Sequence, residues 1–262
     1  TARYSTGGAG TQTSAMVVGG EPSPAFTELY NGTNWTEVND LNSGKVYAAA
    51  AGTTNTAVVA AGSPSLTELW NGTNWTEVNN RNENRQIEMC GSSTAALAIG
   101  GTGPSALVEL WNGTNWTETG DINTGRGNMA AVGTSTASLI SGGTNPSPPT
   151  TAATELWNGS SWTEVNDLNT ARNLLAGGGT STAALDFGGA LGPNGSRTAI
   201  TESWNGTNWA ETSDLNTARS ELAGAGTQTA ALAAGGQVPP QTQTAATEEW
   251  NITGGIKTIG DG

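Results

Sequence analysis

One module of roughly 40 to 47 residues recurs six times along this chain, and every copy carries an aromatic hairpin-like segment near its end. The clearest copy of that segment reads ELWNGTNWTE from Glu68 to Glu77. A module this short cannot bury its apolar faces alone, so neighbouring copies must pack on one another. The repeat therefore restricts the fold to stacked or ring-like architectures such as solenoids, propellers and arrays.

The repeat continues through the whole chain, which predicts a single domain covering residues 1–262. The units span about 1–42, 43–82, 83–123, 124–169, 170–216 and 217–262. A basic residue holds the third position of each unit: Arg3, Lys45, Arg85, Arg126, Arg172 and Arg219. Later in each unit a glutamate stands two residues before an aromatic residue; these glutamates are Glu28, Glu68, Glu109, Glu155, Glu202 and Glu248.

Each unit contains four short strand-like runs bounded by turn residues. In the unit that begins at Thr170 we expect strands at 174–178 and 183–187, a third running into Trp204 and a fourth beginning at Trp209. The first run of a unit is rich in Gly and Ala, whereas the last two carry the Trp residues. Small inner and large outer side chains suit sheets arranged radially around an axis. A solenoid explains this gradient less well, so we predict an all-β, six-bladed β-propeller of four-stranded antiparallel blades.

The Asn-Gly pair inside the aromatic segment indicates a tight turn, because both residues tolerate positive φ. The rings on either side of the turn then face each other across the strand pair and fix its register. The last unit departs from this pattern, since its second Trp is missing between Asn251 and Ile256. We expect the ring to close by face-to-face packing of the first and sixth blades, because the sequence gives no sign of a swapped strand.

Composition excludes several classes of function. The chain has no His, one Cys and only two Lys, so it lacks the residues of zinc sites, thiol catalysis and Ser-His-Asp triads. The net charge of −13 argues against binding to nucleic acid, and no run approaches the roughly 20 apolar residues of a membrane span. We expect no enzyme activity, no cofactor and no metal, and a buried, structural role for Cys90.

Repeated carboxylates raise the question of a glycosidase or a calcium site. They are Glu37, Glu77, Glu118, Glu164 and Glu211. Equivalent positions in different blades lie far apart, whereas an acid-base pair must lie within about 5–10 Å and calcium ligands cluster in one segment. Neither kind of site is expected.

The order of signature residues in each unit resembles that of kelch repeats. The sixth unit shows a basic residue at Arg219, a double glycine at Gly235 and Gly236, and Glu248 before Trp250; the fifth shows the internal Trp at Trp209. The resemblance implies a propeller of four-stranded blades. Two departures are Ala61-Gly62 in place of the glycine pair and the absent second Trp of the last unit. The recurring sequence LWNGTNWTE is also similar to propeller segments of bacteriophage tail-fibre and virion-appendage proteins. This resemblance implies a virion or extracellular location.

All ten prolines lie in the connection between the second and third strands of a unit, and this connection absorbs most of the length variation. Variable loops on a rigid scaffold are common recognition sites. The candidate residues of this variable-loop face are Pro22, Pro64, Pro104, Pro148, Pro193, Asn194, Arg197 and Pro239.

Strand alternation places the six basic residues on the same face, next to the axis. One interpretation is a basic ring at a channel mouth that binds an acidic glycan or a carboxylate side chain. The other is that each basic residue pairs with a repeat glutamate, such as Glu28 or Glu68, because buried charges need partners. The sequence favours the pairing and leaves both open.

The leading functional hypothesis is a non-enzymatic structural or receptor-binding propeller of a phage tail fibre or virion appendage. Its expected partners are a host cell-surface glycan or protein, or another virion protein, with oligomerisation allowed within the appendage. The alternative is a secreted or cell-surface, lectin-like carbohydrate-binding propeller.

Overall fold

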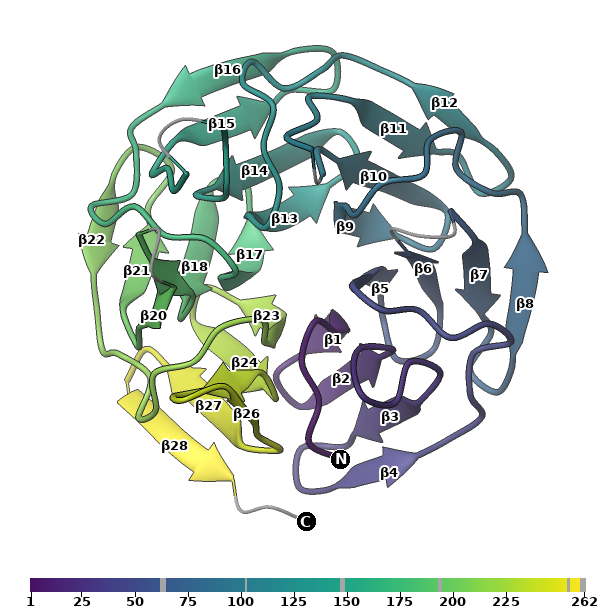
Figure 1. The fold of residues 1–262 in the computed structure, drawn as a ribbon, viewed down its shortest axis with the longest axis horizontal. Coiled ribbons are helices and arrows are strands. Elements are labelled where there is room, and N and C mark those ends of the chain that lie inside the picture. The colour runs from purple at the N-terminus through teal and green to yellow at the C-terminus, as the bar shows by residue number, and fades with distance from the viewer. Residues whose placement is uncertain (62–64, 102, 147–148, 193–194, 254, 260–262) are drawn as a thin grey trace.

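The structure, a computed structural model, describes residues 1–61, 65–101, 103–146, 149–192, 195–253 and 255–259. Strand pairing gives six four-stranded antiparallel sheets, arranged as blades around a central axis (Figure 1). Each repeat unit forms one four-stranded sheet, so the blades are numbered one to six in chain order. The prediction of an all-β propeller with four-stranded antiparallel blades is confirmed.

The strand bounds are as follows. Blade one contains β1 (Gly7–Thr11), β2 (Ser14–Val18), β3 (Thr27–Tyr30) and β4 (Trp35–Glu37). Blade two contains β5 (Ala48–Gly52), β6 (Ala57–Ala61), β7 (Thr67–Trp70) and β8 (Trp75–Val78). Blade three contains β9 (Glu88–Ser92), β10 (Ala95–Ile99), β11 (Val108–Trp111) and β12 (Trp116–Glu118).

Blade four contains β13 (Ala130–Thr134), β14 (Ala137–Ser141), β15 (Thr154–Trp157) and β16 (Trp162–Val165). Blade five contains β17 (Ala176–Thr180), β18 (Ala183–Phe187), β21 (Thr201–Trp204) and β22 (Trp209–Glu211). Blade six contains β23 (Ala223–Thr227), β24 (Ala230–Ala234), β27 (Thr247–Asn251) and β28 (Gly255–Ile259). Two small hairpins, β19 (Ala190–Leu191) with β20 (Ser196–Arg197) and β25 (Gln237–Val238) with β26 (Thr242–Gln243), extend the loops of blades five and six.

In the unit that begins at Thr170, the second, third and fourth strands lie where the sequence predicted them, but the first does not. It spans Ala176–Thr180 instead of 174–178. Leu174 has a φ of +54°, and its N–H bonds to the carbonyl oxygen of Asn128 in the neighbouring blade. A left-handed backbone cannot continue a strand, so the strand begins two residues later.

The inner strands pack so closely around the axis that small residues are required there (Figure 1). A Cβ on Gly8 would lie 2.6 Å from the carbonyl oxygen of Gly224, and one on Gly224 would lie 2.5 Å from that of Gly177. The Gly- and Ala-rich first strands therefore permit the ring to form.

The paired rings of the aromatic hairpins join adjacent blades. Trp70 and Trp75 face each other in register with ring centroids 5.2 Å apart. The outer ring of a hairpin also reaches the preceding blade: Trp75 donates its Nε1–H to Thr27 Oγ1 at 2.9 Å. Where Val108 replaces that threonine, Trp162 donates instead to the carbonyl oxygen of Gly120 at 3.0 Å. The hairpins thus fix register within a blade and join it to its neighbour.

The double glycine makes a second contact between blades. In blade one, the N–H of Gly20 bonds to the carbonyl oxygen of Lys45, the basic residue of the next blade, at 2.9 Å. The preceding Gly19 has a φ of +66°, and a Cβ there would lie 2.6 Å from the same oxygen. Both the backbone conformation and the space therefore require glycine.

The ring closes with the contacts that join the other blades, and no strand is exchanged between the described sheets. Trp35 donates to Thr247 Oγ1 at 3.0 Å, and the N–H of Gly236 bonds to the carbonyl oxygen of Arg3 at 2.8 Å. Gln12 Nε2 adds a 2.8 Å bond to the carbonyl oxygen of Trp250. The predicted closure by face-to-face packing is confirmed.

Candidate functional site

The six basic residues of the repeat are buried, with exposed fractions of 7% or less. Each one forms an ion pair with the repeat glutamate of its own blade, at N–O distances between 2.5 and 3.2 Å. Arg3, Lys45, Arg85, Arg126, Arg172 and Arg219 therefore do not form an open basic ring at the channel mouth. They form buried ion pairs with the repeat glutamates instead, because a charge this deeply buried needs an opposite charge.

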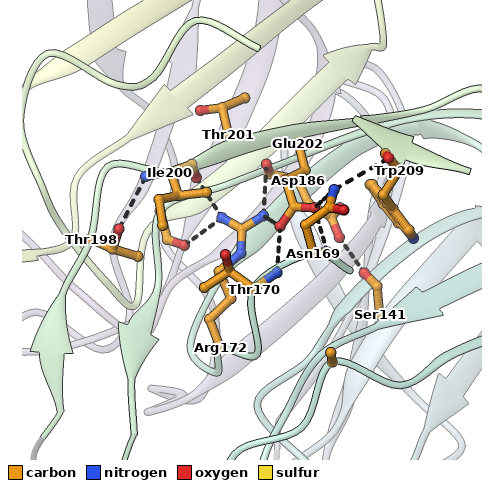
Figure 2. Close-up of polar contacts among 12 residues, drawn as sticks. Ser141, Asn169, Thr170, Arg172, Asp186, Thr198, Ile200, Thr201, Glu202 and Trp209 are labelled. Carbon is orange, nitrogen blue, oxygen red and sulfur yellow. Dashed lines mark hydrogen bonds and ion pairs between the residues drawn. The ribbon is translucent and has the colours of Figure 1, made fainter. Parts of the chain in front are cut away.

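Blade five shows what such a pair does (Figure 2). Arg172 lies at 3.2 Å from Glu202 and also donates to the carbonyl oxygens of Gly188 and Ile200. Glu202 accepts bonds from the backbone and side-chain nitrogens of Asn169 at 2.7 and 2.8 Å. The ion pair thus ties together two loops and a strand, and burial lowers the pKa of Arg172.

Blade five also contains a buried carboxylate that the sequence analysis missed. Asp186 lies on β18 and accepts a hydrogen bond from Ser141 of blade four (Figure 2). Burial raises its pKa to about 7. A Cβ on the facing Gly177 would lie 2.6 Å from Asp186 Oδ1, so the glycine makes room for the carboxylate. The signal was present in the sequence, because the equivalent residues of other blades, such as Ile140 and Ala233, are apolar.

The variable-loop face is only partly described. Pro64, Pro148, Pro193 and Asn194 lie outside the described residues. Pro22 and Pro239 are exposed in their loops, and Pro104 is half-buried. Of the predicted residues of this face that are described, Arg197 lines a cavity, the groove described next.

This loop groove lies between the loops of blades four, five and six and has a volume of about 280 Å³. Its polar lining residues are Thr144, Thr150, Asn173, Arg197, Ser220 and Gln241. Four of their atoms are buried without any hydrogen-bond partner: Thr150 Oγ1, Asn173 Oδ1, Arg197 Nε and Ser220 Oγ. Native proteins leave few buried polar groups unpaired, so this cluster is suited to a polar ligand.

A second cavity, of about 70 Å³, opens around the axis. Its rim includes the residues two positions after each repeat basic residue, which are Ser5, Tyr47, Ile87, Asn128, Leu174 and Glu221. Glu88, on β9, also lines this cavity, and no ion pair joins its carboxylate to a cation in the described part of the chain. Burial raises its pKa to about 8. The corresponding residues of other blades include Ala48, Leu175 and Leu222, so Glu88 is another departure from the repeat.

Other chemistry is limited among the residues that the structure describes. No group of three or more His, Cys, Asp and Glu side chains there could hold a metal ion. Within the same residues, no helix is both long and apolar enough to cross a membrane. Cys90 is buried, as predicted, and burial raises its pKa to about 12.

Comparisons with known proteins identify the fold. No protein-family model matches this chain, and no curated protein sequence matches it significantly. Among solved structures, the chain is similar to YjhT with a TM-score of 0.79 and 12% sequence identity, covering 99% of this chain and 98% of YjhT. At that identity the likeness concerns the fold alone. The chain is therefore an all-β propeller with four-stranded blades, similar in architecture to YjhT over nearly its full length.

Proposed function

We propose that this chain is a non-enzymatic recognition propeller that binds a host-surface glycan in the loop groove. The observation that supports this most is the cluster of four buried, unpartnered polar atoms on Thr150, Asn173, Arg197 and Ser220. A ligand with several hydroxyl groups supplies both donors and acceptors to such a cluster. The groove volume of about 280 Å³ lies near the lower end of the range of small-ligand sites.

The lining chemistry favours binding over catalysis. The groove is lined by Thr, Asn, Ser, Gln, Arg and small residues, and no carboxylate, His or Cys belongs to this described lining. General acid-base and nucleophilic catalysis commonly use those groups. Recognition by hydrogen bonds needs only the hydroxyl, amide and guanidinium groups that are present.

The repeat is proposed to be of the kelch type. Support comes from its four signature positions, each of which has a defined contact in this chain. In blade five, Arg172 and Glu202 form the buried pair, the N–H of Gly189 bonds to the carbonyl oxygen of Arg219 at 2.8 Å, and Trp209 donates to Thr154 of blade four. This residue order recurs along the chain, with the departures at Ala61-Gly62 and in the last unit.

The biological setting proposed is a phage tail fibre or another virion appendage, where the propeller binds a host receptor or docks another virion protein. Support comes from the similarity between the sequence of these repeats and that of propeller segments in appendage proteins. A secreted or cell-surface lectin-like module is the second candidate, favoured by the same groove. Mass spectrometry of purified virions separates the two, because a chain found only as a free secreted product contradicts the appendage assignment.

The binding proposal is tested with the purified chain on a glycan array, followed by calorimetry with any sugar that binds. Thr150→Val and Ser220→Ala remove hydroxyls that have no protein partner, so we expect unchanged thermal stability and binding at least tenfold weaker. Thr73→Val, at an exposed site in a hairpin turn, is the matched control and should bind like the parent. If the parent chain binds none of the neutral or acidic glycans on the array, the glycan proposal is rejected.

A further inference from the structure

Arg197 differs from the other arginines of this chain. Seven of the nine Lys and Arg residues form ion pairs with Glu. In the described part of the chain, Arg197 and Lys257 form none. Lys257 is exposed on the edge strand β28, whereas Arg197 is half-buried in the loop groove. In a protein with a net charge of −13, a partly buried guanidinium without a carboxylate is an exception.

The contacts of Arg197 hold its guanidinium in place without neutralising it. Nη2 donates to Gln237 Oε1 in the hairpin loop of blade six, and Nη1 donates to the carbonyl oxygen of Gly195 at 3.4 Å. Both acceptors are uncharged, and Nε is buried without a partner. The side chain therefore retains a full positive charge and a free donor inside a groove. An arginine in this state binds carboxylates well, because its planar fork of donors matches their geometry.

We propose that the loop groove selects acidic saccharides of the uronic-acid class, with the sugar carboxylate bound by Arg197. This inference rests on the proposed function and adds the ligand class. The sugar hydroxyls pair with the unpartnered groups of Thr150, Asn173 and Ser220. Thr150 Oγ1 and Ser220 Oγ can each donate or accept, and Asn173 Oδ1 accepts. Each buried polar atom without a partner then gains one.

The charge distribution favours a ligand with one negative charge at the groove over a polyanion. The described lining contains a single cation and no carboxylate, so one anionic group is neutralised locally. A nucleic acid or heavily sulfated chain needs several cations along its path. The acidic remainder of this protein repels such a polymer.

Gln237 is the positioning residue for this site. It comes from β25 of blade six, whereas Arg197 comes from β20 of blade five. Their hydrogen bond joins the two loop hairpins and holds the guanidinium at the groove. We expect Gln237→Ala to weaken acidic-sugar binding less than loss of Arg197, since the charge remains.

The test uses calorimetry on the full chain with matched oligosaccharides: oligogalacturonate against oligogalactose, and oligoglucuronate against oligoglucose. We expect an acidic member to bind at least tenfold more tightly than its neutral partner, and this advantage to shrink as salt rises. Arg197→Gln should remove the advantage, because it weakens binding of the acidic sugar by a larger factor than binding of the neutral one, while Arg197→Lys should retain part of the advantage. Lys257→Gln makes the same charge change at an exposed site away from the groove and should behave like the parent.

The outcomes separate this inference from the proposed function. Equal binding of acidic and neutral sugars, or an equal loss of both in Arg197→Gln, overturns the acidic-ligand inference and leaves glycan recognition standing. If none of the four oligosaccharides binds, the acidic-ligand inference is overturned. If no sugar on the wider glycan array binds either, the proposed function is overturned as well. Thermal denaturation of each variant confirms that the comparison is made between folded proteins.

Discussion

The buried pair of Arg126 and Glu155 shows how a single glutamate organises a blade. Glu155 Oε1 lies 2.5 Å from Arg126 Nη1, and Glu155 Oε2 accepts two bonds of 2.8 Å from Asn123. Both side chains are inaccessible to solvent. Two desolvated charges stabilise the fold only while both are present, because either one alone is left buried without compensation.

Glu155→Gln should therefore destabilise the protein by about 3–5 kcal/mol. The matched control is Glu164→Gln, because Glu164 stands directly opposite Glu155 in the strand register but is exposed. The control should change stability by about 0.5 kcal/mol or less. Urea denaturation measures both, and equal effects of the two substitutions would contradict the role assigned to the pair.

The contribution of Glu88 to the stability of the fold is expected to depend on pH. Its pKa in the folded protein is about 8, above its ordinary value of 4.5, because burial disfavours the charged form. The folded state thus binds this proton more tightly, and the Glu88 contribution to stability falls as pH rises from about 4.5 to 8. Glu88→Gln does not titrate, so its stability relative to the parent should increase over that window by an amount on the order of 2 kcal/mol. Urea denaturation at pH 4, 6 and 9 checks this; a difference that does not vary with pH would refute it.

The interface between two blades is set by the outer residue of each aromatic hairpin. Trp75, Trp116 and Trp209 each donate to a threonine hydroxyl of the preceding blade, at 2.9 to 3.2 Å. Blade six has Ile256 in the corresponding position, paired with Trp250 across the strands. A shallow depression, lined by residues including Phe187, Thr201 and Ile256, lies where the missing ring would pack.

Ile256→Trp should cover this depression with the missing ring and donate its Nε1–H to Thr201 Oγ1, as the outer Trp residues of other blades do with their threonines. We expect a gain in stability of about 1–2 kcal/mol. Ile256→Phe fills space without supplying a donor and should gain less. Thermal and urea denaturation measure the series; a loss of stability in both variants would show that the site is already full and becomes overpacked.

For the whole molecule, the contact between blades one and six decides whether the ring is closed. The seam repeats the contacts of an ordinary interface: Gln12 reaches blade six as Gln228 reaches blade five. The glycine contact is repeated as well, with a Cβ on Gly235 predicted to lie 2.7 Å from the carbonyl oxygen of Arg3. Blade one thus packs on blade six although the two are distant in sequence.

Gly235→Ala tests the seam. The substitution combines a left-handed φ of +65° with a clash against Arg3, and should cost about 2–4 kcal/mol. Gly103→Ala is the control, because Gly103 has a φ of +79° but no atom within 4 Å of its added Cβ. Its cost should be about 1 kcal/mol from the backbone alone. If urea denaturation gives the same loss for both, the close approach at the seam is not important for stability.

The sequence alone determined the features that recur with the repeat. Small residues in the first strand of each unit, and aromatic residues around an Asn-Gly turn in the last two, specify radial four-stranded blades. Both signals are local: Asn71 bonds to the N–H groups of Thr73 and Asn74 within its own turn. The register of Trp70 against Trp75 follows from that turn.

The tertiary structure decided what the recurring charges do and where a ligand can bind. A basic residue such as Arg126 is compatible with a channel ring or a buried pair until Glu155, 29 residues away, is placed beside it. The loop groove joins loops from three blades. Arg197 stands out only once every other arginine is seen to pair with a glutamate, because its own guanidinium bonds to uncharged acceptors. Burial and pairing depend on neighbours that are distant in the chain, so the sequence specifies the blades while their assembly around the axis creates the candidate site.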